Sequence, residues 1–443
     1  MIKYLTAIVS SLFFMQSISA QDIAEQQLKD AGKALATFNL KDTDSDRLSY
    51  LESAKGLINS ALESSSVQAK TSAWLLKGDI YYTLCEYESV QRLIKGIKKV
   101  PLNIYPISAW NAYLKGYQKA DAGSKEKRDA LTGIASIQQY IFNAGAGHLQ
   151  EQDMSNAFMH FNAVMRSHDL LKTNNQKSLL DDSSTYKTAV YAAAVSAQST
   201  EHYMEAINFY NDLYFIGNAS EDVYEGLYNT RLAMGNIPEA DRLLIEGRAK
   251  YPDNAALLFA QINVNLKNNK LNETVPLLKT AIGKEPENTG LYLSLGQVYD
   301  NLEQKMTKAN NKEKATEYFR EAKKYYAIAL EKDAKNLDAA YSLGTMHYNK
   351  ASLLSSRLGE LSSDKSETVK KATEILEAEM LNQFEMALPY FQKAESIDPN
   401  DAGTLTALYN IYIQKISPLA DEFKKRKDLV KNGGKNSVPY FSK

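Results

Sequence analysis

Residues 291–299 of this 443-residue chain read LYLSLGQVY. The fold follows from the way in which this stretch places a glycine inside a predicted helix. Leu291, Leu295 and Val298 recur at the spacing of one helix face, so the stretch predicts a helix. Gly296 lies in the middle of that helix, where a glycine costs about 0.5–1 kcal/mol relative to alanine. Something elsewhere in the chain must account for this glycine.

The same glycine position recurs along the chain. Gly344 lies in AYSLGTMHY, which repeats the Ser-Leu-Gly core of the first stretch. Gly78 in AWLLKGDIYY and Gly145 in IFNAGAGHL also lie within amphipathic helical runs. Second runs follow the last two glycines about a dozen residues later, carrying Val90 and Ile94, and Ala157 and Phe161. Self-similarity of this kind is the signature of stacked structural repeats.

Prolines give the period of the repeat. Pro252 and Pro286 are 34 residues apart, and Pro399 takes the same place after an insertion. The pattern resembles the tetratricopeptide repeat, which reads W-x2-L-G-x2-Y, then A-x3-F, then P, every 34 residues. The positions that match are Trp74, Gly78 and Tyr81; Tyr292, Leu295, Gly296 and Tyr299; Ala206 and Tyr210; Ala240 and Leu244; Ala322 and Tyr326; Ala387 and Phe391.

This resemblance implies an all-α fold, a right-handed α-solenoid of antiparallel helix pairs. It also explains the glycine, because in such repeats the small residue lets the paired helix approach closely and the packing offsets its low helix propensity. We expect about eight to nine helix pairs over residues 21–425, with a last helix at 402–425 that covers the open end. The pairs are expected at 23–62, 70–98, 128–165, 184–215, 221–250, 255–284, 289–332 and 337–397. A helix at 106–121 fits the pattern poorly.

Two repeats are longer than the pattern requires. The polar insertion at 301–322 is expected to lengthen two helices by about two turns each. The insertion at 350–383 predicts an elongated helical hairpin with SSDKS at its tip, in which two leucine-rich faces meet: Leu353, Leu354, Leu358 and Leu361 against Val369, Ile375, Leu376 and Leu381. Such an arm serves either to dock a partner or only as a self-packed embellishment.

The first twenty residues have the form of a secretory signal peptide. Lys3 precedes a short apolar stretch, and a cut before Gln21 would remove it. The alternative, a membrane anchor, needs a longer apolar stretch, and no later segment reaches that length. We therefore predict that the chain is exported and has no transmembrane segment. The periplasm is the preferred location, and the extracellular space and the outer membrane are the alternatives. The formal net charge of -1 does not favour nucleic acid as a partner.

Motifs that carry catalysis are missing from the sequence. The five histidines form no HExxH, and neither GxSxG nor a Walker-type loop occurs. A metal site built from His148 and His160 would lack a third ligand. The single cysteine, Cys85, excludes both an intramolecular disulfide and a multi-cysteine metal site. We predict no catalytic residue, no metal and no cofactor. The alternatives are an enzyme, or a non-catalytic subunit of an envelope enzyme or of a secretion complex.

The family resemblance also implies where a partner would bind. The first helix of each repeat lines the concave groove in this family, and the residue after the aligned glycine faces inward. These positions hold Asn229, Asn263, Gln297, Thr345 and Asn410. Carboxamides at this spacing can form hydrogen bonds with the main chain of a bound peptide. The alternative is that they are only polar residues exposed to solvent in the groove. The lysine clamp for a C-terminal carboxylate is absent, and its place is taken by an apolar floor at Tyr191, Phe259, Leu293 and Tyr341.

The C-terminal segment 426–443 is expected to be a basic tail. One expectation is that its cations weakly contact an anionic component of the envelope. The other is that they only balance the negative end of the helix dipole. Together these observations predict a non-enzymatic scaffold or adaptor of the bacterial cell envelope, which binds a protein or peptide partner in the groove or at the arm. The alternative is a glycan- or nutrient-capture component, although only two tryptophans are present to stack on sugars.

Overall fold

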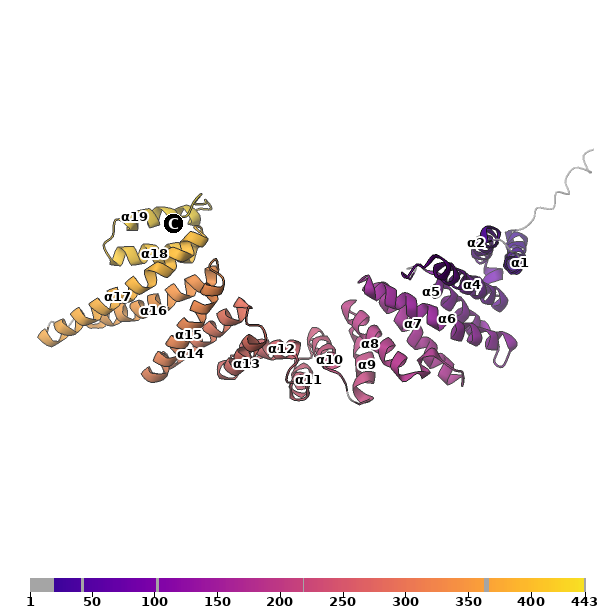
Figure 1. Ribbon diagram of the computed structural model, residues 1–443, viewed down its shortest axis with the longest axis horizontal. Coiled ribbons are helices and arrows are strands. Elements are labelled where there is room, and N and C mark those ends of the chain that lie inside the picture. The colour runs from indigo at the N-terminus through magenta and orange to yellow at the C-terminus, as the bar shows by residue number, and fades with distance from the viewer. Residues whose placement is uncertain (1–19, 41–43, 101–102, 218, 362–365, 442–443) are drawn as a thin grey trace, which may run out of the picture. The chain divides into compact units, whose positions relative to one another are not determined.

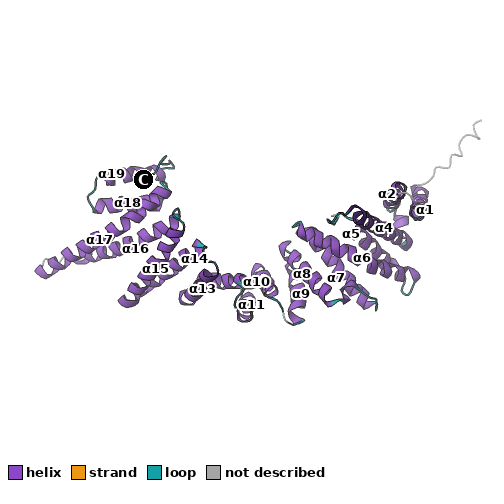
Figure 2. Cartoon of the chain, viewed as in Figure 1, coloured by secondary structure: helices purple, strands orange, loops and turns teal. Residues whose placement is uncertain are grey.

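The computed structural model describes residues 20–40, 44–100, 103–217, 219–361 and 366–441, and throughout these ranges the regular structure is helical (Figures 1 and 2). The proposed signal peptide lies outside them, apart from Ala20. The chain forms two compact units, residues 1–247 and 248–443.

The first unit is a series of antiparallel helix pairs. Its helices are α1 (Ala20–Phe38), α2 (Asp44–Ala61), α3 (Ser65–Gln68), α4 (Thr71–Lys95), α5 (Tyr105–Lys119), α6 (Lys125–Gln150), α7 (Met154–Thr173), α8 (Ser183–Ser199), α9 (Tyr203–Phe215), α10 (Glu221–Ala233) and α11 (Ile237–Lys250), with a short turn η1 (Leu179–Asp181) before α8. The pairs α1–α2, α4–α5, α6–α7 and α8–α9 pack most extensively.

The expected pair at 70–98 is wrong, because α4 is one helix of 25 residues. No glycine or proline interrupts it between Gly78 and Gly96, where a left-handed residue ends it. Val90 and Ile94, expected to form the buried face of a second helix, are 51% and 70% exposed. The true partner of α4 is α5, the helix that fitted the repeat poorly.

Close packing explains the glycines, as predicted. A Cβ atom on Gly296 would lie 2.5 Å from the Tyr326 ring, and one on Gly344 would lie 3.0 Å from Phe391. Tyr113 of α5 contacts two glycines at once, since a Cβ on Gly78 or on Gly133 would come within 2.5 or 2.4 Å of its ring. These aromatic side chains come from the second helix of a pair and fill the space that the first helix leaves open.

The other repeat positions pack as the pattern requires. Ala206, Ala240 and Ala387 are fully buried. Gly145 faces His160 and Phe161, where a Cβ would lie 3.1 and 3.2 Å away. The Trp74 ring donates its Nε1 proton to the carbonyl of Gln68, 2.9 Å away.

The second unit continues the pairing, with the pairs α12–α13, α14–α15, α16–α17 and α18–α19. Its helices are α12 (Ala255–Lys267), α13 (Leu271–Lys284), α14 (Thr289–Lys308), α15 (Lys312–Lys332), α16 (Leu337–Leu361), α17 (Glu367–Ile397), α18 (Ala402–Gln414) and α19 (Leu419–Lys431). Pro252, Pro286 and Pro399 lie in the turns between pairs. The helices α14 and α15 have 20 and 21 residues, against 13 and 14 for α12 and α13.

The arm at 350–383 differs in detail from the expected hairpin. The helices α16 and α17 pack along each other, with Leu354 and Met380 buried between them. Leu353 and Ile375 do not face the partner helix and are 43% and 68% exposed. Each lies one helical position, about 100°, from a leucine that does pack, so it turns outward. Residues 362–365 of the proposed tip lie outside the described residues.

The C-terminal end is also more structured than a helix with a tail. The stretch 402–425 holds two helices rather than one, and α19 continues to Lys431. Arg426 forms an ion pair with the fully buried Glu395 at 2.9 Å. The main-chain N–H groups of Tyr440 and Phe441 also donate to that carboxylate, at 2.7 and 3.0 Å. The segment that we expected to be a basic tail therefore packs back onto α17.

Candidate partner-binding site

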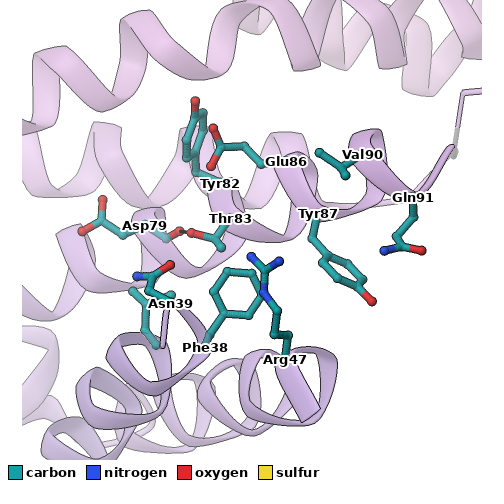
Figure 3. Close-up of a pocket in the computed structure, with 11 residues that line it drawn as sticks. Phe38, Asn39, Arg47, Asp79, Tyr82, Thr83, Glu86, Tyr87, Val90 and Gln91 are labelled. Atoms are coloured by element: carbon teal, nitrogen blue, oxygen red, sulfur yellow. Dashed lines mark hydrogen bonds between the residues drawn. The ribbon is translucent and has the colours of Figure 1, made fainter. Parts of the chain in front are cut away.

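The first helices of the pairs lie along one side of the first unit. Helix α4 packs on α6 more extensively than α5 packs on α7, so the side lined by the first helices is the more tightly curved one. Between α4 and the pair α1–α2 this side opens into a cavity of about 630 Å³ (Figure 3). We call it the α4 groove.

One face of α4 forms the wall of the α4 groove. Asp79, Tyr82 and Glu86 are three or four residues apart, so they stand above one another on the helix. Phe38 and Arg47 reach the groove from the opposite side, and the Arg47 guanidinium lies 4.5 Å from the centre of the Phe38 ring. The Nε of Arg47 is buried and makes no hydrogen bond within the described residues.

A second cavity, of about 380 Å³, lies on the other side of the same ridge of α4. It shares Asp79 and Tyr82 with the α4 groove and adds Asp129, Gly133 and Ser136 of α6. The two cavities therefore adjoin along α4.

Carboxylates give this surface its charge. Asp79, Glu86 and Asp129 form no ion pair with any described residue. The Tyr113 hydroxyl donates to Asp79 at 2.9 Å. The Asp79 side chain is exposed, yet protein surrounds it on several sides, and this desolvation raises its pKa, with a further contribution from the Asp129 charge. A cation from a partner would relieve that cost.

Aromatic rings supply the contact area. Tyr82 and Tyr140 meet edge to face at 5.8 Å, and Phe38 and Tyr87 do so at 6.2 Å. Burial raises the pKa of Tyr82, so its hydroxyl remains protonated and able to donate at neutral pH. Rigid aromatic rings beside polar groups are typical of surfaces that bind proteins.

The predicted row of amides is partly accessible. Asn229, Asn263 and Gln297 are exposed on α10, α12 and α14. Asn410 is half-buried and donates to the Tyr348 hydroxyl at 3.0 Å. Thr345 is half-buried too, and its buried Oγ1 has no hydrogen-bond partner among the described residues. The row is divided between the two units, with Asn229 in the first and the others in the second.

The predicted apolar floor is less open than expected. Tyr191 is 37% exposed and lines a separate cavity of about 350 Å³ with Lys187, Leu213 and Asp222. Phe259 and Leu293 are half-buried and pack against the core of the second unit. Tyr341 packs edge to face on Phe391 at 5.7 Å and lies against Gly403. Most of these side chains therefore serve packing between repeats.

Sequence reasoning missed the α4 groove, although the signal was present. The residue after an aligned glycine was expected to face inward, and after Gly78 that residue is Asp79. The predicted row starts at Asn229 and does not include Asp79. Arg47 and Phe38 carry no repeat signature, so only the structure places them in the groove.

The histidines do not form a metal site in the described structure. His148 and His160 have ring centres 5.0 Å apart, and the Asp153 carboxylate accepts from His148 Nδ1 at 3.1 Å. His160 Nδ1 lies 2.7 Å from the carbonyl of Asn156, and burial lowers the pKa of His160. No group of three or more metal-ligating side chains is present among the described residues.

The pair α12–α13 has helices of 13 and 14 residues, and small residues of first helices lie against aromatic rings of second helices in other pairs. Each unit has the helix-pair fold of a helical repeat protein, and its packing resembles that of the tetratricopeptide repeat. No protein-family model matches it, and no curated protein does. Among the described helices, none is long and apolar enough to cross a bilayer.

Solved structures similar to this chain include three repeat proteins. MamA from AMB-1 is 19% identical, with 48% of this chain and 92% of that chain covered and a TM-score of 0.34. A TPR repeats protein from Bacteroides fragilis is 19% identical over 67% of this chain and 98% of its own, with a TM-score of 0.25. Human IFIT1, solved as a dimer with m7Gppp-AAAA, is 12% identical over 92% and 94%, with a TM-score of 0.28.

Proposed function

We propose that this chain is a non-catalytic scaffold or adaptor of the bacterial cell envelope that binds a partner protein through the α4 groove. The observation that carries this proposal is the pair of adjoining cavities along α4, which combine aromatic rings with carboxylates that form no ion pair with a described residue. A protein segment satisfies both kinds of group, since it offers cations, main-chain donors and apolar side chains.

Export is part of the proposal and rests on the sequence of residues 1–20. If the signal is cut before Gln21, the envelope fraction contains a chain whose N-terminal residue is Gln21. N-terminal sequencing of the protein from fractionated cells tests this. A chain that retains Met1, or one found only in the cytoplasm, would contradict export and leave the binding proposal untouched.

The binding proposal is tested by crosslinked pull-down of the tagged chain from its native envelope, read by mass spectrometry. The groove variant changes Asp79 and Tyr82 to Ala, both solvent-accessible in the groove. One control variant changes Asn229, Asn263 and Gln297 to Ala, and a second shortens the arm at 350–383. We expect a stoichiometric protein partner that is lost only in the groove variant.

Two other outcomes would replace this proposal. Loss of the partner in the amide variant or in the arm variant would move the site to the predicted row or to the helical hairpin. Glycans or other small molecules that co-purify in place of a protein would favour a capture component instead of a scaffold.

A further inference from the structure

The C-terminal half of α4 carries an apolar stripe that no other part of the described chain covers. Val90, Leu93, Ile94 and Ile97 are 51%, 82%, 70% and 49% exposed. Their spacing places them on one side of the helix, as in a helix that packs against another. Exposed apolar patches of this kind mark interaction sites on soluble proteins.

The stripe continues the wall of the α4 groove. Val90 lines the groove itself, together with Glu86 and Asp79 further back along the helix (Figure 3). Steps of seven, four and four residues lead from Asp79 through Glu86 and Val90 to Ile94, so all four stand on one face. From Asp79 to Ile97 this face is about 27 Å long, which matches a partner helix of about five turns.

The end of the stripe is held in a defined position. Gly96 adopts a left-handed conformation, and the N–H groups of Gly96 and Ile97 bond to the carbonyls of Leu93 and Arg92 at 3.2 and 2.9 Å. This is a Schellman ending, which fixes Ile97 beside the last turn of the helix. The stripe is therefore presented by a helix and its cap, and not by a loose loop.

Charge changes sign along the same face. Glu86 and Asp79 lie at one end of the stripe. Lys98 is exposed at the other end, directly after Ile97, and forms no ion pair with a described residue, whereas Lys95 lies on the opposite side of the helix from Val90. Lys99, by contrast, is paired with Glu151 at 2.8 Å. The face thus runs from acidic through apolar to basic in the direction of the chain.

We propose that this face binds an amphipathic helix of a partner protein, antiparallel to α4, with acidic residues in its first turn and basic residues in its last turn. Such a helix places its basic end over Asp79 and Glu86 and its acidic end beside Lys98. The same charge order also suits its own dipole, because acidic residues stabilise a helix N-terminus and basic residues a C-terminus. This inference rests on the proposed function and specifies the partner of the same groove.

The test uses the full chain and designed helical peptides of about 20 residues, with binding measured by fluorescence anisotropy. The matched peptide has a leucine stripe, Glu in the first turn and Lys in the last turn. A second peptide replaces the leucines with Gln, and a third replaces the Lys residues with Glu. We expect the matched peptide to bind at least tenfold more tightly than either of the others.

Variants of the chain locate the binding. Leu93→Asp combined with Ile94→Asp should weaken binding of the matched peptide at least tenfold. The control combines Ile413→Asp with Ile416→Asp, which are 45% and 93% exposed in the second unit, and should leave binding unchanged. All four side chains are exposed, so circular dichroism melting should show that the variants remain folded.

Three results would overturn the inference. The first is equal binding of all three peptides, and the second is unchanged binding of the matched peptide to the Leu93 and Ile94 variant. The third is a sedimentation experiment in which the full chain is a dimer and this variant is a monomer. The last result would assign the stripe to a second copy. A protein partner that is still captured through Asp79 and Tyr82, while the peptides ignore the stripe, would refute this inference alone and leave the proposed function standing.

Discussion

At the scale of single residues, the repeat glycines have opposite roles according to what lies beside them. A Cβ on Gly78 would lie 2.5 Å from the Tyr113 ring, whereas one on Gly56 would meet nothing within 4 Å. Both glycines lie inside helices of the first unit. The comparison separates the packing role of a glycine from its intrinsic cost in a helix.

We expect Gly78→Ala to destabilise the first unit by about 1–3 kcal/mol, since the ring must shift to admit a methyl group. Gly56→Ala is the matched control and should stabilise it by about 0.5–1 kcal/mol through helix propensity. Urea unfolding measures both. If the two substitutions change stability in the same direction, the close approach of Tyr113 does not explain the glycine.

Asp79 gives the groove a dependence on pH. Its pKa is raised in the folded protein above the ordinary value of 3.8, so ionisation opposes folding. Asp79→Asn keeps the oxygen that accepts from Tyr113 and removes the charge. We expect this variant to be more stable than the parent chain at pH 7.

The sign follows from the two protonation states. As pH falls below 3.8, Asp79 becomes protonated in both the folded and the unfolded chain, so the advantage of the Asn variant should disappear. Denaturant unfolding at pH 7 and at pH 3 measures the difference. An Asn variant that is less stable at pH 7 would show that Asp79 stabilises the first unit instead of straining it.

At the scale of elements, the sequence predicts the repeats well and their exceptions poorly. The repeat glycines and prolines predict the pairs 255–284 and 289–332. The observed pairs α12–α13 and α14–α15 begin and end at these residues. The error at 70–98 arose because Val90 and Ile94 look like a buried face. A better signal was Ala109 with Tyr113, which has the A-x3-aromatic spacing of a second helix and forms the core of α5.

The α4 groove is only partly predictable from the sequence. The position of Asp79 follows from the repeat, since it comes directly after Gly78. The contributions of Phe38 and Arg47 depend on how α1 and α2 pack against α4, and no repeat position encodes that packing. The C-terminal contacts of Glu395 were missed because a buried carboxylate has no sequence periodicity.

Two adjacent leucines in the arm test how α16 packs against α17. Leu354 is 8% exposed between α16 and α17, whereas Leu353 is 43% exposed. We expect Leu354→Ala to cost about 2–5 kcal/mol and Leu353→Ala to change stability by less than about 0.5 kcal/mol. Guanidinium unfolding of the two variants measures this. Equal costs would mean that the hairpin packs through a different face.

The C-terminal closure is a second test. The fully buried Glu395 carboxylate binds Arg426 and the N–H groups of Tyr440 and Phe441. We expect Glu395→Gln to destabilise the second unit by about 3–5 kcal/mol, since it removes the buried charge partner of Arg426, which keeps only the more exposed Glu422 at 3.3 Å. The control is Glu385→Gln, whose 55% exposed carboxylate pairs with Lys415 and should cost less than about 1 kcal/mol. Similar melting temperatures for the two variants would contradict this closure.

At the scale of the whole molecule, the chain is a series of helix pairs that exposes side chains it does not use for folding. The core of each repeat is made by small residues and aromatic rings, which leaves the first helices free to carry other groups. On α4 these groups are carboxylates, tyrosines and an apolar stripe. A scaffold needs such a surface, and the proposed function requires that a protein partner binds to it.

The most direct measurement is site-specific photocrosslinking in the native host, with a benzophenone amino acid in place of Tyr82. The control position is Phe215, which is 77% exposed at the end of α9 and lies outside the groove. We predict that a stoichiometric protein is captured from position 82 but not from position 215, and that Asp79→Lys abolishes the capture. No protein captured at position 82, or equal capture at both positions, would contradict the account.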